Sequence, residues 1–254
     1  VLNHIGSYHW WMDDLPSKDW INNSAVFSST THLRETLHDP YALKKDVKSF
    51  TDGWFVEVMP DLNQRNKFLK KYLIQNSIWW IEFAQLSGFR LDTYSYSDRN
   101  FLYQWNAAIQ SEYPGFNIVG EEWTLDKSII GLWQKNPDQY ESDLSLILNK
   151  INPSNVPALM DFPLQSAIIK AMNPKINHWD DKLVNLYRNM AKDYLYPNPN
   201  NMVVFLENHD MSRSFYQLNH DLEYWKMAHA FLLTTRGIPQ IYYGSEVLLS
   251  DSIN

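Results

Sequence analysis

The stretch GFRLDTYSYSD, residues 88–98, places an arginine and an aspartate two positions apart at the end of a short β-like run. It follows a segment with the apolar spacing of a helix, residues 67–86, and Gly88 is a typical helix stop. Alternate residues of a strand share a face, so we expect Arg90 and Asp92 to lie side by side. In that position Arg90 would keep Asp92 ionised and hold its orientation.

Strand-like and helix-like segments alternate along most of the chain, an order typical of a parallel sheet with crossover helices. Strands are predicted at 1–5, 88–94, 117–123, 158–162, 201–210 and 238–244, and helices at 67–86, 98–112, 126–134, 163–172, 178–194 and 221–236. Residues 6–60 are irregular, and residues 135–157 are expected to form a loop.

Polar residues gather where the predicted strands end: Asn3, His4, Asp92, Glu121, Asp161, His209, Asp210 and Glu246. In a (β/α)₈ barrel the active site lies at that end and takes residues from several strands. We therefore predict an α/β fold, part of a (β/α)₈ TIM barrel. A flavodoxin-like sheet would also bind ligands there, but it would need a glycine-rich phosphate turn, which the sequence lacks.

Composition excludes several classes of function. The net charge of −7 provides no basic face for nucleic acid. The absence of cysteine excludes disulfides and Cys-ligated zinc, and no apolar run is long enough for a transmembrane segment. We expect an ordinary globular protein, which could also form a homo-oligomer.

Aromatic residues make up 15% of the chain, and they can fill a core or line a groove that stacks on sugar rings. The pair Trp10–Trp11 could do either. Trp79 and Trp80 lie mid-helix and are predicted to be core. Tyr242 and Tyr243 are predicted to fill the interior of the barrel.

Three carboxylates follow three different strands: Asp92, Glu121 (or its neighbour Glu122) and Asp210. Glycosidic bond cleavage needs one ionised carboxylate near the anomeric carbon and one protonated carboxyl that donates to the leaving oxygen. Arg90 favours the ionised form of Asp92, whereas apolar neighbours favour a raised pKa for Glu121. A single such residue would more simply be a capping carboxylate, but three of them together favour catalysis.

The sequence resembles the α-amylase family, glycoside hydrolase family 13, in six blocks that come in the family's order. These blocks are VLNH at 1–4, MPDLN at 59–63, GFRLDTY at 88–94, IVGEEW at 118–123, FLENHD at 205–210 and GIPQIYYGSE at 237–246. The resemblance implies that Asp92 is a nucleophile forming a covalent glycosyl-enzyme, and that Arg90 orients it. The GExW frame selects Glu121 as general acid/base, and Asp210 would bind sugar hydroxyls and favour the distorted sugar.

The same resemblance implies further substrate contacts from His4, His209 and Trp123. It also implies a domain organisation. Residues 1–5 and 61–254 would belong to the catalytic barrel, which would be incomplete and consist of roughly strands 3 to 8. Residues 6–60 would be a small subdomain inserted after strand 3. Both ends are expected to be cut from a longer protein.

The resemblance is greatest to cyclomaltodextrinase and neopullulanase-type enzymes of Bacteroidetes, through MPDLNQRN, NSIWWIEFA and GFRLDTYSYSD. It implies a retaining hydrolase of α-1,4-glucosidic bonds in cyclodextrins, maltooligosaccharides or pullulan-type glucans. Many α-amylases carry Lys and His where this chain has Ser95 and Tyr96. An endo-α-amylase or α-glucosidase, and a non-catalytic glucan-binding homologue, stay as alternatives.

No cofactor is expected to be required for the chemistry. Asn3 and Asp61 match positions that ligate a structural calcium ion in many members of the family, and they could equally be hydrogen-bonding loop residues. The expected partner is an α-glucan oligosaccharide, with neither nucleic acid nor a membrane segment. The resemblance leaves the periplasm or the cytoplasm as the compartment and favours the periplasm.

Overall fold

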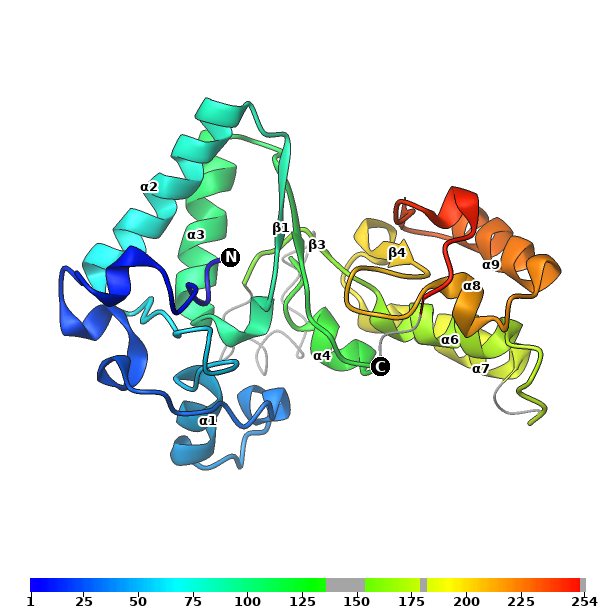
Figure 1. Ribbon diagram of the computed structural model, residues 1–254, viewed down its shortest axis with the longest axis horizontal. Coiled ribbons are helices and arrows are strands. Elements are labelled where there is room, and N and C mark those ends of the chain that lie inside the picture. Colours follow the sequence, from blue (N-terminus) through cyan, green and yellow to red (C-terminus); the bar gives the residue numbers. More distant parts are fainter. Residues whose placement is uncertain (136–153, 179–181, 252–254) are drawn as a thin grey trace. The chain divides into compact units, whose positions relative to one another are not determined.

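The computed structural model describes residues 1–135, 154–178 and 182–251. They divide into two compact units. The first contains residues 1–122 and 154–157, and the second contains residues 123–135 and the described residues from 158 onward. Figure 1 labels the helices and strands of both units.

The first unit contains a parallel pair of short strands, β1 (Gly88–Leu91) and β2 (Asn117–Gly120). Gly88 lies opposite Asn117, and a Cβ at Gly88 would meet the Asn117 carbonyl oxygen at 2.8 Å, so only glycine allows this close pairing. At the other end Leu91 lies opposite Gly120. The two strands therefore end level with each other, and the residues that follow them share one edge.

Two helices lie side by side next to β1 in Figure 1: α2 (Lys67–Ala84) and α3 (Arg99–Glu112). Side-chain caps fix where both begin. Asn66 accepts hydrogen bonds from the amides of Phe68 and Leu69, and Asp98 accepts one from the amide of Phe101. The apolar faces are buried: Leu69, Leu73 and Ile81 from α2, and Phe101, Leu102, Trp105 and Ile109 from α3.

Residues 6–60 are irregular, as predicted, and contain one α-helix, α1 (Lys44–Thr51). The rest of their helical structure is four 3₁₀ turns, at Trp10–Met12, Lys18–Trp20, Asn22–Ala25 and Arg34–Leu37. The strand predicted at 1–5 is wrong. A strand needs a partner along its length, and this segment makes only a single antiparallel bridge, between His4 and Asp61.

The second unit contains β3 (Ala158–Leu159), β4 (Val203–Phe205) and β5 (Ile238–Gln240). β4 pairs with β5 in parallel, and Met160 after β3 makes a parallel bridge to Val203. The helices are α4 (Lys127–Gly131), α6 (Phe162–Met172), α7 (Leu183–Met190), α8 (Ser214–Gln217) and α9 (Leu222–Thr234). Leu164 and Ile168 of α6, Val204 of β4 and Leu232 of α9 belong to one buried apolar cluster.

The other five predicted strands exist but are shorter than expected, and left-handed residues lie within or at the end of two of the predicted ranges. Thr93, with φ of 48°, follows β1, and Gly244, with φ of 85°, lies beyond β5. The predicted helices at 126–134 and 178–194 shorten to α4 and α7. Most of the loop predicted at 135–157 lies outside the described residues.

Two predictions about aromatic residues are wrong. Trp79 and Trp80 are 51% and 44% exposed, since the buried stripe of α2 runs through positions 69, 73, 77 and 81 instead. Tyr243 is exposed rather than filling a barrel interior, because the chain has already left β5. Trp11 packs edge-on against Trp20, so it is buried in the first unit, whereas Trp10 is exposed.

None of the helices in the described residues combines the length and the hydrophobicity of a membrane-spanning segment.

A buried ion network stabilises the second unit. Arg236 pairs with Asp161 at 2.8 Å and with Asp193 at 2.6 Å, and Lys127 reaches the same Asp193 oxygen at 2.6 Å. The hydroxyl of Tyr196 donates to Asp161, which is fully buried. Such a network depends on all its charges, because a buried carboxylate that loses its cation is strongly destabilising.

We expect Arg236→Met to lower the free energy of unfolding by about 3–5 kcal/mol, because it leaves Asp161 buried without a cation. Chemical denaturation measures this. Lys226→Met is the matched control, since Lys226 pairs with Glu223 on an exposed helix face and such pairs contribute at most about 1 kcal/mol. An equal loss of unfolding free energy in the two variants would show that the buried network does not stabilise the fold.

Candidate functional site

The candidate site begins where β1 and β2 end. Asp92 follows Leu91 and Glu121 follows Gly120, and these two strand residues lie opposite each other. The amide of Glu121 donates to the Leu91 carbonyl at 2.9 Å, which extends the ladder by one step. The two carboxylates therefore leave neighbouring strands at the same edge, as the sequence predicted.

Arg90 holds both carboxylates. Its Nη1 donates to Oδ1 of Asp92 at 2.5 Å and its Nη2 donates to Oε1 of Glu121 at 2.6 Å. The other oxygen of Glu121 accepts the amide of Thr93 at 3.1 Å. Sequence reasoning predicted the contact with Asp92 but missed the contact with Glu121, because the register between β1 and β2 is a long-range property.

The two carboxyl groups differ in their surroundings. Burial acts to raise the pKa of Asp92, but the hydrogen bond and charge of Arg90 outweigh it, so this pKa lies below its usual range. Burial raises the pKa of Glu121, and the negative charge of Asp92 adds to the shift despite Arg90. The side chain of Asp92 is 29% exposed and that of Glu121 only 7%. The pair thus consists of one carboxyl whose pKa is lowered and one whose pKa is raised.

His4 belongs to the same site. Its Nδ1 lies 3.0 Å from Oδ1 of Asn3, and the charge of Asp92 acts on it. Burial lowers the pKa of His4 in spite of that charge, which favours a neutral imidazole. The structure therefore brings together four of the residues predicted from the sequence: His4, Arg90, Asp92 and Glu121.

Glu122 faces a different set of residues from Glu121, as neighbours in an extended segment do. It is fully buried and pairs with Arg34 at 3.2 Å. Arg34 also donates to the hydroxyl of Tyr96 at 3.4 Å, and His32 lies 2.9 Å from that hydroxyl. Residues from the 6–60 segment therefore hold Glu122 and Tyr96 in place. The sequence contained no signal for this network, because Arg34 lies in an irregular segment.

Asp210, His209 and Trp123 belong to the second unit. Nε2 of His209 lies 3.1 Å from Oδ2 of Asp210, and both side chains are about half exposed. The amide of Asp210 donates to the side chain of Asn208 at 2.9 Å. Trp123 stacks on Phe162, with ring centroids 4.9 Å apart and planes at 14°.

The loop that carries Asp210 is fixed by Glu207, which sequence reasoning did not single out. Glu207 is buried and pairs with Arg213 at 3.2 Å. The hydroxyl of Ser245 donates to the same oxygen at 2.5 Å, and the amide of Ser214 donates to the other. The acidic residue that follows β4 most closely is therefore a structural one, and Asp210 lies beyond it on the more exposed part of the loop.

The residues predicted as calcium ligands interact with each other. The Asn3 amide donates to Oδ1 of Asp61 at 2.8 Å, and Asp61 is almost fully buried. Burial raises the pKa of Asp61 well above its usual value. Across the described ranges, no cluster of three or more acidic, histidine or cysteine side chains is arranged to hold a metal ion.

Comparison with known proteins gives a consistent result. The family model of the α-amylase catalytic domain matches residues 1–253. A cyclomaltodextrinase of Geobacillus thermopakistaniensis is 26% identical over 97% of this chain, and a cyclomaltodextrin glucanotransferase of Paenibacillus macerans is 29% identical over 88%. The alignments cover 37% and 30% of these relatives, so the chain spans about a third of their length.

Solved structures agree with the sequence comparison. The α-amylase of Geobacillus thermoleovorans, solved in complex with acarbose, superposes on 99% of this chain and 49% of its own, with a TM-score of 0.77 and 26% identity. The fold is therefore of the TIM-barrel type that this family uses. Because the model of the catalytic domain matches almost every residue, the chain belongs to the α-amylase family.

Proposed function

We propose that this protein is a retaining glycosidase that cleaves α-1,4-glucosidic bonds through a covalent glycosyl-enzyme. The observation that carries the proposal is the pair Asp92 and Glu121, held by one guanidinium and shifted in opposite pKa directions. Glycoside hydrolysis requires such a split between a nucleophile and an acid. Family membership supports the same chemistry.

In the proposed mechanism the carboxylate of Asp92 attacks the anomeric carbon while Glu121 gives its proton to the leaving oxygen. Glu121, now ionised, then removes a proton from water, and the resulting hydroxide displaces Asp92 from the sugar. Arg90 keeps Asp92 ionised and aimed during the first step. Asp210 would bind the sugar hydroxyls and favour the distorted ring, and His4, His209 and Trp123 would contact the substrate.

The proposed domain organisation follows from the same family relation. Residues 1–5 and 61–254 would belong to the catalytic barrel, and residues 6–60 would form the inserted subdomain. The contacts of Arg34 and His32 with Glu122 and Tyr96 support a role for this subdomain in shaping the site.

The proposed substrates are cyclodextrins, maltooligosaccharides or pullulan-type glucans, since relatives over nearly the whole chain are a cyclomaltodextrinase and maltogenic amylases. The second candidate is an α-amylase acting on starch, which the superposition on the Geobacillus thermoleovorans enzyme favours.

Asp92→Asn in the full-length protein should lower kcat at least about 10³-fold, because the amide cannot attack the anomeric carbon. Release of reducing sugar from maltooligosaccharides measures kcat, and thermal unfolding shows that the fold is intact. Asp14→Asn, at an exposed position, is the matched control and should keep full activity. Hydrolysis at the wild-type rate by the Asp92 variant would remove this residue from the mechanism. An inactive wild type would favour a non-catalytic glucan-binding protein.

The pH dependence of kcat/KM should be bell-shaped. Activity needs Asp92 ionised, so it falls when pH drops through the lowered pKa of Asp92. It also needs Glu121 protonated, so it falls when pH rises through the raised pKa of Glu121. Arg90→Met removes a positive charge that lowers both pKa values, so both limbs should move to higher pH. Arg90→Lys, which keeps the charge, should move them less. Unmoved limbs in the Met variant would mean that Arg90 does not set either pKa.

Initial rates on β-cyclodextrin and on soluble starch should separate the two candidate substrates. We expect faster cleavage of β-cyclodextrin at equal glucose content. Much faster cleavage of starch would favour the α-amylase.

A further inference from the structure

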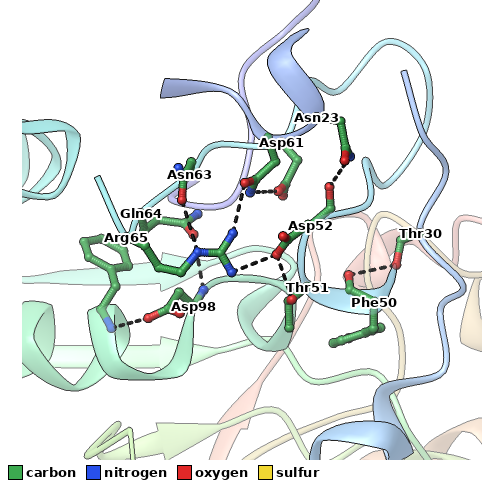
Figure 2. Close-up of polar contacts among 12 residues, drawn as sticks. Asn23, Thr30, Phe50, Thr51, Asp52, Asp61, Asn63, Gln64, Arg65 and Asp98 are labelled. Carbon is green, nitrogen blue, oxygen red and sulfur yellow. Dashed lines mark hydrogen bonds and ion pairs between the residues drawn. The ribbon is translucent and has the colours of Figure 1, made fainter. Parts of the chain in front are cut away.

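Asp61 belongs to a polar cluster in the first unit, and Figure 2 shows the part of it around Arg65. Its two carboxylate oxygens each accept one amide N–H. Nδ2 of Asn3 donates to Oδ1 at 2.8 Å, and Nδ2 of Asn22 donates to Oδ2 at 2.7 Å. All three side chains are buried. The carboxylate is therefore satisfied by nitrogen donors from two segments of the chain.

These residues do not fit a calcium site. Calcium takes six to eight oxygen ligands, and an asparagine that serves it presents its oxygen rather than its NH₂ group. Here both asparagines turn their NH₂ groups toward Asp61. A cation beside Asp61 would compete with these N–H groups for both carboxylate oxygens.

Arg65 determines which way the Asn22 amide faces. Its Nη2 donates to Oδ1 of Asn22 at 3.0 Å. A guanidinium has only donors, so turning the amide over would set two donors against each other. Asn22 must therefore keep its oxygen toward Arg65 and its NH₂ group toward Asp61, and it is not available as an oxygen ligand.

The other two guanidinium nitrogens of Arg65 bind further residues of the cluster. Nη1 pairs with Oδ1 of Asp52 at 2.8 Å, and Nε donates to Asn63 at 3.2 Å. Asp52 is buried, and its carboxylate also accepts the hydroxyl of Thr51 at 2.9 Å. Figure 2 shows Arg65 between Asp52 and the Asn63–Asp61 segment. One cation thus joins the end of α1, the 3₁₀ turn at Asn22–Ala25 and the segment that leads into α2.

Arg65 stays positively charged in these surroundings. Burial acts to lower its pKa, but the hydrogen bond and charge of Asp52, with the charges of Asp98 and Asp61, raise it overall. The outer part of the side chain is exposed, and an exposed ion pair alone would contribute little. The contribution comes from the inner side, where its partners Asp52 and Asn22 are buried.

We propose that Arg65 takes the structural role of a bound calcium ion in this chain. The contact between residues 6–60 and the start of α2 is then stable without a metal ion. The guanidinium neutralises Asp52, fixes the Asn22 amide against Asp61 and links the three segments. This inference concerns metal dependence and is independent of the proposed hydrolysis.

The test is thermal unfolding of the full-length protein in excess EDTA and in excess calcium chloride. A metal that binds the native state raises Tm by mass action. We expect the wild type and Asp61→Asn to respond equally to calcium, so that any response comes from elsewhere in the protein. A calcium-dependent rise in the wild-type Tm that Asp61→Asn abolishes would overturn the proposal.

The role of Arg65 is tested with variants in EDTA. Arg65→Met should lower Tm by about 3–6 °C, since it leaves Asp52 buried without a cation. Lys71→Met, which removes an exposed charge from α2, is the matched control and should leave Tm unchanged. Arg65→Lys keeps the charge with fewer fixed donors and should fall between the wild type and the Met variant. An unchanged Tm in Arg65→Met would contradict the proposal.

A double-mutant cycle shows whether Arg65 acts through Asp52. The Tm of Arg65→Met combined with Asp52→Asn should be no lower than that of Arg65→Met alone, because the second change removes a charge that has lost its partner. Additive losses would mean that the two residues act separately and would overturn the proposed link. None of these measurements depends on glucan hydrolysis, so failure of one proposal leaves the other standing.

Discussion

The candidate site depends on the guanidinium of Arg90, which contacts one oxygen of Asp92 and one of Glu121. A planar group with fixed donors can hold two carboxylates in set positions, which a lysine could not do as well. The contact is made possible by the parallel register of β1 and β2, which ends both strands level with each other. Without Arg90, two carboxyl groups on adjacent strands would repel each other whenever both were ionised. With it, the pKa of the more exposed Asp92 is lowered, whereas burial keeps the pKa of Glu121 raised despite the positive charge.

Two further arginines bind buried carboxylates away from this pair. Arg65 and Arg34 both contact buried carboxylates, Asp52 and Glu122, that lie in or next to the irregular first part of the chain. This part has little regular structure, so it is fixed by specific polar contacts rather than by ladders of backbone hydrogen bonds. Arg34 supports the strand end that carries Glu121, and Arg65 supports the start of α2. Charged side chains therefore stabilise the irregular segment as well as forming the candidate site.

Much of the candidate site around Arg90 could be predicted from the sequence. Its residues lie close to strand ends, and strand-like and helix-like segments alternate clearly along the chain. Arg90 and Asp92 share a strand face, a local property that two-residue spacing reveals. The contact of Arg90 with Glu121 and the network of Glu122 with Arg34 could not be predicted, because they depend on strand register and on the path of an irregular segment. Residues 1–5 were mistaken for a strand because apolar composition does not supply a pairing partner. Trp79 and Trp80 were mistaken for core because α2 has large apolar residues on more than one face, and composition does not show which face is covered. The convergence of Asp210 with Asp92 and Glu121 stays a prediction.

The most direct test of the account is to trap the glycosyl-enzyme. A fluorinated glucosyl substrate that forms the covalent intermediate quickly and loses it slowly would label the nucleophile, and trypsin would cut after Arg90 and Arg99 to release the peptide 91–99. Mass spectrometry should find one added sugar on this peptide, with fragmentation placing it on Asp92 rather than on Asp98. A label on Glu121, Glu122 or Asp210, or unlabelled enzyme that hydrolyses with inversion at the anomeric carbon, would contradict the central claim.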